Sequence, residues 1–436
     1  MKILLVNKDC QIAGTEAFMV GLSAMIHARG HHCELFFFEH GPMQQHLPAD
    51  CPVHFGDLAD CMKLVRSRNF DLVHANSSDV RIGIAAVRSA GAKLVITAHG
   101  MVVPAWNSTN CDALVSCSRW QVEEQKLLTD LPVHTVMNGI DIDKFTPSNS
   151  VAATAPPIVA WVGRGIDMVH KRIDKLAGIA PLLHEAGVRL WLADPYGPEK
   201  VAEVVPGAVR TLEPLVEFWD KVPKEDLPGF YQKVAASGGC LLSTSIREGF
   251  GLALAEAQGC GCPVIGADVR GVNEVVRPEH GGVLYPFAMP DEELANLVLD
   301  TINDKEGMRW RRARCVEFVR EHFGLKRMAE DYLRIYEEVL NSARERKSVR
   351  RAHRRRLAAV ALHWQEYVER SWSAGRSQYE ASKKLAAQGE WELAAAAARL
   401  SALTCPTLYA RPERLAHLAK ALFHTSAFPN KRQVAK

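Results

Sequence analysis

The sequence predicts an α/β protein with two Rossmann-like domains that face a cleft and a C-terminal α-helical extension. Three observations lead to this fold. Short β-branched and apolar runs recur at intervals of roughly 20 to 30 residues between residues 2 and 286, and helical patterns separate them. Turn-forming and proline-rich residues interrupt this rhythm near 140–157. Beyond about residue 305 only helical patterns continue.

The runs themselves have the composition of buried parallel strands. Seven precede the interruption: Ile3–Val6, Glu34–Phe38, Val53–Phe55, Leu72–His74, Leu94–Thr97, Leu114–Ser116 and His134–Val136. Six follow it: Ile158–Val162, Arg189–Ala193, Val209–Leu212, Cys240–Ser243, Val264–Ala267 and Val283–Tyr285. Together they exceed one ordinary doubly wound sheet. A TIM barrel is the alternative, but it closes eight βα units without a proline-rich break in the middle.

These boundaries divide the chain into four parts. We expect one Rossmann-like domain over residues 1–150 and a second over 151–325, then a crossover helix over 326–343 and a basic α-helical extension over 344–436. The helical patterns span Glu306–His322, Lys326–Asn341, Leu357–Arg370, Gln378–Gln388 and Trp391–Leu403, with a break at Gly389. Five residues of the crossover helix have the spacing of a core-facing stripe: Met328, Tyr332, Ile335, Tyr336 and Val339.

Composition places the chain among ordinary soluble proteins. Of its 436 residues, 47% are apolar and 24% are charged, which excludes global disorder, collagen and coiled coil. The start of the chain lacks a secretory cleavage pattern, and the uncharged stretch 145–163 contains three prolines, so we expect a cytoplasmic protein without a membrane span. The eleven cysteines form no CxxC pair and are expected to be buried thiols.

Charge is distributed unevenly. Residues 341–436 hold 19 Lys and Arg against 7 Asp and Glu, whereas the remainder of the chain is net acidic. Residues 344–356 alone contain eight basic side chains. This run is read either as a solvated or packed helix face or as a surface for anionic lipid, which would attach the protein peripherally at the inner face of the cell membrane. No module that reads nucleic acid accompanies the run, so a nucleic-acid partner is not expected.

The sharpest local pattern begins at Ser243, where a predicted strand runs into a loop with glycines at 249 and 251 and then into an Ala- and Leu-rich helix. Such a loop directs free backbone N–H groups and the positive end of the helix dipole toward one point, which favours an anion. Glu248 lies on the loop and Glu256 lies on the helix. The alternative is a capped helix with two solvated carboxylates.

Several motifs together resemble the retaining GT-B glycosyltransferases of family 4. Glu248 and Glu256 stand in EGFGLALAEA with seven residues between them. Further matching segments are Val162-Gly163-Arg164 with Lys171, Asn138-Gly139-Ile140-Asp141 with Phe145, Gly271-Val272-Asn273-Glu274, Asp71-Leu72-Val73-His74, Thr97-Ala98-His99-Gly100, Gly14-Thr15-Glu16 and Arg29-Gly30-His31. The resemblance covers about residues 1–340. It implies an acceptor domain first and a nucleotide-sugar donor domain second.

The resemblance also implies roles for donor-domain residues. Glu256 would form hydrogen bonds with the ribose hydroxyls of the donor, and Glu248 would contact the hexose of the donor. Arg164 and Lys171 would neutralise the diphosphate, with Arg172 competing with Lys171 for that role. The backbone near the sugar and diphosphate would come from Gly249, Phe250, Gly251 and Leu252.

Two residues of the first domain complete the implied site. Gly14 would lie near the phosphates, although Ala13 stands where a double glycine is usual. His99 would face the transferred sugar in a positioning role. In the second domain, Asp194-Pro195-Tyr196-Gly197 replaces a glycine-rich turn of the family.

The implied function is transfer of a hexose from a nucleotide-diphosphate sugar to a glycan, lipid-linked or lipopolysaccharide-type acceptor, as in cell envelope polysaccharide biosynthesis. No cofactor or metal is expected, because Asp141-x-Asp143 reads as a turn cap; the co-substrate would be a UDP- or GDP-sugar. Two other functions stay open. The two glutamates could form the acid and nucleophile of a glycoside hydrolase, or the chain could be a non-catalytic nucleotide-sugar-binding or scaffold protein.

Overall fold

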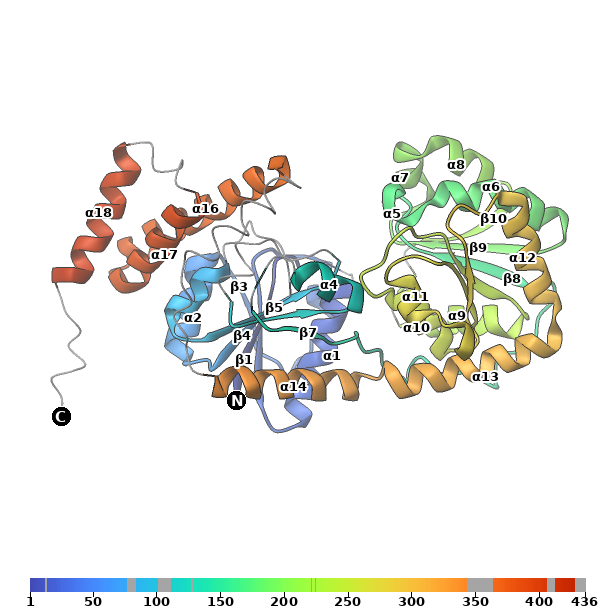
Figure 1. The fold of residues 1–436 in the computed structure, drawn as a ribbon, viewed down its shortest axis with the longest axis horizontal. Coiled ribbons are helices and arrows are strands. Elements are labelled where there is room, and N and C mark those ends of the chain that lie inside the picture. Colours follow the sequence, from blue (N-terminus) through green and yellow to red (C-terminus); the bar gives the residue numbers. More distant parts are fainter. Residues whose placement is uncertain are drawn as a thin grey trace. The chain divides into compact units, whose positions relative to one another are not determined.

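The computed structural model (Figure 1) describes residues 1–11, 14–76, 84–100, 111–126, 129, 131–220, 222–223, 225–342, 364–405 and 412–427. The chain forms two compact units. The first comprises Met1–Cys117, Gln121–Val136 and Ala329–Lys436, and the second comprises Ser118–Trp120 and Met137–Met328. Each unit has its own parallel sheet with helices, which confirms the expected pair of Rossmann-like domains with a helical C-terminal part.

The sheet of the first unit has seven parallel strands in the order β3-β2-β1-β4-β5-β6-β7. The strands are β1 (Lys2–Asn7), β2 (His32–Phe37), β3 (Val53–Phe55), β4 (Leu72–Ala75), β5 (Lys93–Ala98), β6 (Ala113–Ser116) and β7 (Val133–Thr135). The intervening helices are α1 (Gly14–Ala28), η1 (Pro42–His46), α2 (Leu58–Arg68), η3 (Ile84–Ala90) and α4 (Arg119–Lys126). The strand order reverses direction between β1 and β4, which is the switch point of this sheet.

The sheet of the second unit has six parallel strands in the order β10-β9-β8-β11-β12-β13, with its switch point between β8 and β11. The strands are β8 (Ile158–Val162), β9 (Arg189–Asp194), β10 (Val216–Asp220), β11 (Cys240–Ser243), β12 (Val264–Ala267) and β13 (Val283–Tyr285). The helices are α5 (Met168–Lys171), α6 (Ile173–Glu185), α7 (Gly197–Val204), α8 (Pro206–Leu212), α9 (Leu227–Ala236), α10 (Leu252–Gly259), α11 (Val272–Val275), η4 (Pro278–His280), α12 (Asp291–Asn303) and α13 (Lys305–His322).

One predicted strand is wrong. Val209–Leu212 lies in helix α8, and the strand that pairs with β9 is β10, a few residues later. The run is short and apolar, so it satisfies a strand pattern and a helix pattern equally well. In the structure Ala208, Val209 and Leu212 are buried, at the spacing of one helical face.

The crossover helix α14 (Leu325–Asn341) buries the five side chains that its sequence places on one face. Two of these residues bond to the first sheet. The Tyr336 hydroxyl lies 2.6 Å from His74 Nδ1, and the Tyr332 hydroxyl lies 3.0 Å from Thr97 Oγ1. His74 Nε2 lies 2.7 Å from the same Thr97 oxygen. Burial and the neighbouring His99 hold the pKa of His74 well below its usual value, so this ring is a neutral hydrogen-bonding group.

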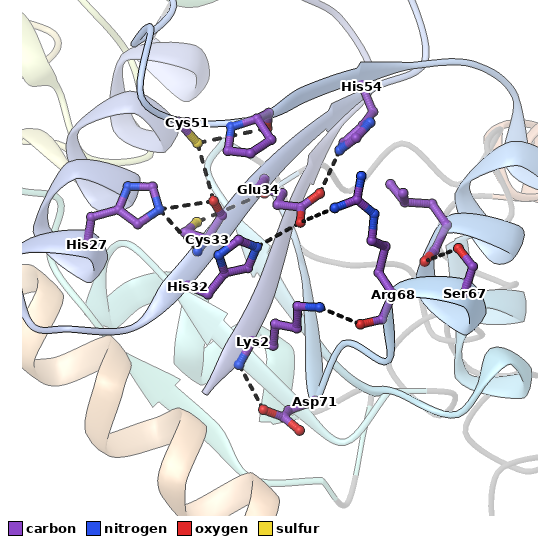
Figure 2. Close-up of polar contacts among 12 residues, drawn as sticks. Lys2, His27, His32, Cys33, Glu34, Cys51, His54, Ser67, Arg68 and Asp71 are labelled. Carbon is purple, nitrogen blue, oxygen red and sulfur yellow. Dashed lines mark hydrogen bonds and ion pairs between the residues drawn. The ribbon is translucent and has the colours of Figure 1, made fainter.

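A buried carboxylate lies near the amino-terminal ends of the strands of the first sheet (Figure 2). Glu34 of β2 is fully buried, and its two oxygens lie 2.7 Å from His32 Nε2 and 2.6 Å from His54 Nε2. Burial alone would raise the pKa of Glu34, but these two hydrogen bonds and the Arg68 guanidinium at 3.6 Å hold it below its usual value. The cluster therefore carries an ionised carboxylate at neutral pH.

Two C-terminal helices pack on the first unit. We expected two helices here, Leu357–Arg370 and Gln378–Gln388. In the part of this segment that the structure describes they form one helix, because α16 runs without a break over Trp364–Ala387. Gly389 has a φ of +79° and turns the chain into α17 (Trp391–Thr404), where the predicted break is confirmed. Leu385 and Leu393 join the core formed by α2 and the sheet. Lys384 of α16 also pairs with Asp60 of α2 at 2.7 Å.

This packing favours the intramolecular interpretation for the described part of the extension. A further helix, α18 (Pro412–Ala427), was not predicted, and it contacts α17 through Leu418 and Ala421. The basic run 344–356 lies outside the described residues. Among the helices that are described, none has both the length and the apolar character needed to cross a bilayer.

Docking of the helical hairpin α16–α17 can be tested at Leu385. Replacing this fully buried side chain with alanine should lower the free energy of unfolding of the first unit by about 2–5 kcal/mol, because it leaves a cavity between α16 and α2. Leu415→Ala on α18 is the matched control, since that side chain is 51% exposed and its loss should cost less than about 0.5 kcal/mol. Thermal unfolding followed by circular dichroism measures both. Equal midpoints for the two variants would contradict the docking.

Candidate active site

The switch point of the second sheet brings together the two donor-domain segments that the sequence analysis singled out. β8 runs into Gly163 and Arg164, and the neighbouring strand β11 runs into the loop that precedes α10. Ligands of open parallel sheets bind outside the carboxyl ends of the strands at this point. The topology therefore places both loops at one binding edge.

Two glycines give the loop after β11 its shape. Gly251 precedes α10 with a φ of +85°, a conformation that side chains other than glycine rarely adopt. Gly271 has a φ of +84°, and a Cβ atom there would lie 2.0 Å from the carbonyl oxygen of Glu248. The Glu248 N–H donates to the carbonyl of Arg270 at 3.0 Å. The loop is thus tied to the segment after β12, and the first amides of α10 lack an intrahelical acceptor.

An ion pair links this loop to α5. Lys171 Nζ lies 2.5 Å from Glu248 Oε1, and Ser245 Oγ donates to the same oxygen at 2.7 Å. Both charged side chains are largely buried, with 20% of Lys171 and 13% of Glu248 exposed. The segment after β11 holds α5 in place, because the Thr244 hydroxyl donates to the carbonyl of Lys171 at 2.6 Å and the Ile246 N–H donates to the carbonyl of His170 at 2.8 Å.

The competing cation, Arg172, is directed elsewhere. Its guanidinium pairs with Asp174 at 2.8 Å and lies 5.7 Å from the ring centroid of Phe287. The structure thus places Lys171, and not Arg172, beside Glu248.

Arg164 lies at the end of β8 with about half of its side chain exposed, 3.6 Å from the Asp167 carboxylate. Its loop is fixed by Asp194, whose two oxygens accept from the N–H of Gly165 at 2.5 Å and the N–H of Tyr196 at 2.8 Å. Burial raises the pKa of Asp194 against the effect of these two bonds. The departure from the family at residues 194–197 therefore supplies a carboxylate that shapes the Arg164 loop.

Glu256 lies within α10 and is 7% exposed. The Tyr231 hydroxyl donates to its Oε2 at 3.5 Å, and burial raises the pKa of Tyr231 well above its usual value, so the phenol stays protonated. Glu248 and Glu256 therefore have different partners: a cation and a hydroxyl for the first, a phenol for the second.

The remaining residues of the loop after β11 differ in how far they are exposed to solvent. Phe250 is buried and packs edge-on against Phe323 at 5.2 Å between ring centroids, so its side chain belongs to the core. Gly249 and Leu252 are partly exposed, with Leu252 as the first residue of α10. For Phe250 only the backbone is available to a ligand.

Sequence reasoning missed the contacts that Arg119 and Trp120 make with the loop and with Glu274. Trp120, a residue of the second unit, donates its indole N–H to the carbonyl of Glu248 at 3.0 Å, and its ring lies 5.7 Å from the Arg247 guanidinium. The backbone N–H groups of Arg119 and Trp120 donate to the Glu274 carboxylate at 2.7 and 3.0 Å. No local sequence pattern indicates these contacts, because the two residues of each contact are more than a hundred positions apart in the chain.

The two first-unit residues lie at the carboxyl edge of their own sheet. His99 follows β5 and packs against Phe18 at 4.6 Å between ring centroids, and Cys117 Sγ donates to its carbonyl at 3.3 Å. Burial lowers the pKa of His99 to about 4, so its imidazole is neutral at physiological pH. Gly14 is the exposed first residue of α1.

Among the described residues, no group of three or more His, Cys, Asp or Glu side chains is placed so that it could hold a metal ion. Independence of a metal stays a prediction. Asp141 Oδ1 accepts from the N–H groups of Asp143 and Lys144, which is the turn role expected for this segment. All eleven cysteines are described, buried and free of disulfides, as predicted.

Comparison with known protein families gives a match to each of the two sheet-forming regions of the chain. Residues 12–144 match the family described as Glycosyltransferase Family 4, and residues 156–304 match the family described as Glycosyl transferases group 1. A D-inositol 3-phosphate glycosyltransferase of Xylanimonas cellulosilytica is 32% identical over 251 residues, 52% of this chain and 56% of that protein. The alpha-maltose-1-phosphate synthase of Mycolicibacterium smegmatis is 30% identical over 48% of this chain and 57% of that protein. The chain spans about half the length of the curated relatives it matches.

Solved structures share the fold. Anabaena Alr3699/HepE in complex with UDP and glucose superposes with a TM-score of 0.64 at 20% identity, over 77% of this chain and 99% of that chain. Sucrose-phosphate synthase from Thermosynechococcus elongatus gives 0.66 at 18% identity, over 79% and 100%. Both sheets, both family matches and the shared fold agree, and the chain belongs to the GT-B glycosyltransferases of the family 4 type.

Proposed function

We propose that this chain is a retaining glycosyltransferase that moves a hexose from a nucleoside-diphosphate sugar to a hydroxyl of a glycan or lipid-linked acceptor without a metal ion. One observation carries the proposal. A largely buried Lys171–Glu248 pair lies beside Ser245 at the switch point of the second sheet, at the edge where Arg164 and the start of α10 also lie.

The leaving group explains the need for these cations. Cleavage of the bond between the anomeric carbon and the phosphate oxygen leaves negative charge on the diphosphate and develops positive charge on the sugar. Lys171 and Arg164 supply positive charge for the diphosphate, and the amides at the start of α10 add the helix dipole. Lys171 would exchange its Glu248 partner for a phosphate oxygen when the donor binds.

The bond changes balance without a protein nucleophile. The acceptor oxygen bonds to the anomeric carbon on the face that the diphosphate leaves, and the acceptor proton passes to the departing phosphate oxygen. Glu248, released from Lys171, would accept hydrogen bonds from hexose hydroxyls, and Glu256 would accept them from the ribose. His99, which is neutral, would bond the transferred sugar and position it.

The donor in this proposal is a UDP- or GDP-sugar. The likeness to Alr3699/HepE, which is described with UDP and glucose, supports a nucleoside diphosphate in the same fold. The buried carboxylate of Glu256 suits the hydroxyl pair of a ribose, which every nucleoside diphosphate of this class carries.

We further propose that the basic run 344–356 attaches the protein to an anionic membrane surface, where a lipid-linked acceptor would reside. The support is charge alone: each Lys or Arg near an anionic leaflet contributes about 1 kcal/mol, and the run has eight. Binding of a membrane to this run would not compete with the packing of α16 and α17 on α2, because that packing uses residues that come after the run in the sequence.

Lys171→Met tests the diphosphate role. Loss of this cation should lower kcat by roughly a hundredfold to a thousandfold, because the leaving group then lacks a positive partner in the transition state. Lys200→Met is the control, since Lys200 pairs with Glu203 on the exposed face of α7. Release of nucleoside diphosphate from UDP- and GDP-sugars measures the effect. Equal rates for the two variants would remove Lys171 from the site.

Glu256→Gln tests the ribose role. The substitution keeps the shape of the side chain but removes the charge that strengthens the hydroxyl bonds, so UDP or GDP should bind about tenfold more weakly. Thermal midpoints at increasing nucleotide concentration report the affinity, because ligand that binds the native state raises its stability. A titration identical to that of the unsubstituted chain would show that Glu256 lies outside the nucleotide site.

The membrane proposal is tested with the helical hairpin left intact. Replacing Arg350, Arg351, Arg354, Arg355 and Arg356 by glutamine should leave the chain in the supernatant when it is spun with phosphatidylserine vesicles at low salt. Arg309→Gln with Arg399→Gln, at exposed positions outside the run, should sediment as the unsubstituted chain does. Unchanged sedimentation of the fivefold variant would show that another surface binds the membrane.

A further inference from the structure

The backbone of Glu248 is bonded to two other segments of the second unit. Its N–H donates to the carbonyl of Arg270 at 3.0 Å, and its carbonyl oxygen accepts from the indole N–H of Trp120 at 3.0 Å. The Glu248 side chain meets Lys171 and Ser245. Because the carbonyl and the carboxylate of Glu248 are joined through one Cα atom, a shift of the carbonyl displaces the carboxylate.

The segment that carries Trp120 is anchored by a carboxylate. Residues 118–120 belong to the second unit, although the chain on both sides of them belongs to the first. The Glu274 carboxylate of α11 accepts from the N–H of Arg119 at 2.7 Å and from the N–H of Trp120 at 3.0 Å. These are the first two N–H groups of α4, which have no acceptor within the helix and favour a negative partner. Glu274 therefore fixes the backbone from which the indole reaches Glu248.

The Trp120 ring also lies against a cation of the loop after β11. The Arg247 guanidinium is 5.7 Å from the centroid of the ring, and Arg247 Nη2 lies 3.4 Å from His170 Nε2. A guanidinium can only donate, so Nε2 is the accepting nitrogen, and the His170 Nδ1–H donates to the Asp167 carboxylate at 2.8 Å. Trp120 therefore supports the loop directly and, through Arg247, the end of α5 that carries Lys171.

We propose that Trp120 is a positioning residue of the transferase reaction: its indole N–H, acting through the Glu248 carbonyl, holds the Glu248 carboxylate where the hexose of the donor binds. The inference rests on the proposed function, because it adds a residue to the same site. Trp120 needs no contact with the donor for this role. Glu274 takes part in it by anchoring the backbone of Trp120.

This role predicts a loss that is confined to the sugar half of the donor. Glu256, which we propose for the ribose, lies on α10 and accepts from the phenol of Tyr231 in α9. A displaced Glu248 should therefore slow the reaction of the nucleotide sugar while the nucleotide alone still binds. A general loss of folded structure would weaken nucleotide binding and turnover together.

Trp120→Phe isolates the indole N–H, because phenylalanine keeps an aromatic ring beside Arg247. The kcat for release of nucleoside diphosphate from a UDP- or GDP-sugar should fall about tenfold, the effect of one typical hydrogen bond, while the affinity for UDP and GDP stays within about twofold. Trp310→Phe is the matched control, since Trp310 is 46% exposed and also has a guanidinium, that of Arg311, 5.8 Å from its ring centroid. Its kcat, donor KM and nucleotide affinity should equal those of the unsubstituted chain.

A double-variant cycle tests whether Trp120 acts through Glu248. In a Glu248→Gln background most of the tenfold loss should disappear, because the carboxylate that Trp120 positions is already absent. Glu274→Gln keeps an oxygen that can accept from the N–H groups of Arg119 and Trp120, so it should lose less activity than Glu274→Ala. The Glu274 pair carries the test if Trp120→Phe does not fold, and full activity of Glu274→Ala would then overturn the role.

Three results with Trp120→Phe would overturn the inference: kcat is unchanged, nucleotide affinity falls as far as kcat does, or its loss adds in full to that of Glu248→Gln. Turnover by the unsubstituted chain separates these results from failure of the proposed function. Turnover that is insensitive to Trp120→Phe rejects the positioning role alone. An unsubstituted chain that turns over neither UDP- nor GDP-sugars rejects the transferase proposal and this role with it.

Discussion

The ion pair between Lys171 and Glu248 is the contact on which the rest of the candidate site depends. A charge pair that is largely withdrawn from water is costly unless further hydrogen bonds support it. Here Ser245 donates to the carboxylate, and the Thr244 hydroxyl and the Ile246 N–H fix the end of α5. The pair therefore holds an ammonium group at the carboxyl edge of the second sheet.

The same pair argues against a glycosidase. A retaining or inverting hydrolase needs two carboxyl groups that work on one bond, one as acid and one as nucleophile or base. Glu248 pairs with a lysine, and Glu256 accepts a hydrogen bond from the phenol of Tyr231 in α9. The two glutamates thus have different surroundings, which is compatible with the proposed contacts to different parts of a nucleotide sugar.

Much of the fold is predictable because buried parallel strands are continuous apolar runs with little ambiguity. The strand predicted at Val209–Leu212 is wrong because this apolar run is short enough to fit both the period of a strand and the period of a helix. The docking of Leu385 under α2 was beyond prediction, since it depends on contacts between residues more than three hundred positions apart.

The candidate site was predictable in part, for a related reason. Motif spacing identified Lys171 and Glu248 without their pairing, and it left Arg172 as a competitor until the structure turned that residue toward Asp174. Trp120 and Asp194 make their contacts with residues that lie far from them in the sequence, so no local pattern could identify these contacts.

A structure of the full chain with UDP or GDP bound tests the central claim most directly. The account predicts a β-phosphate within about 4 Å of Lys171 Nζ and of the Arg164 guanidinium, with the lysine separated from Glu248. A nucleotide bound at another edge, or a Lys171–Glu248 pair that stays closed over an occupied site, would contradict it.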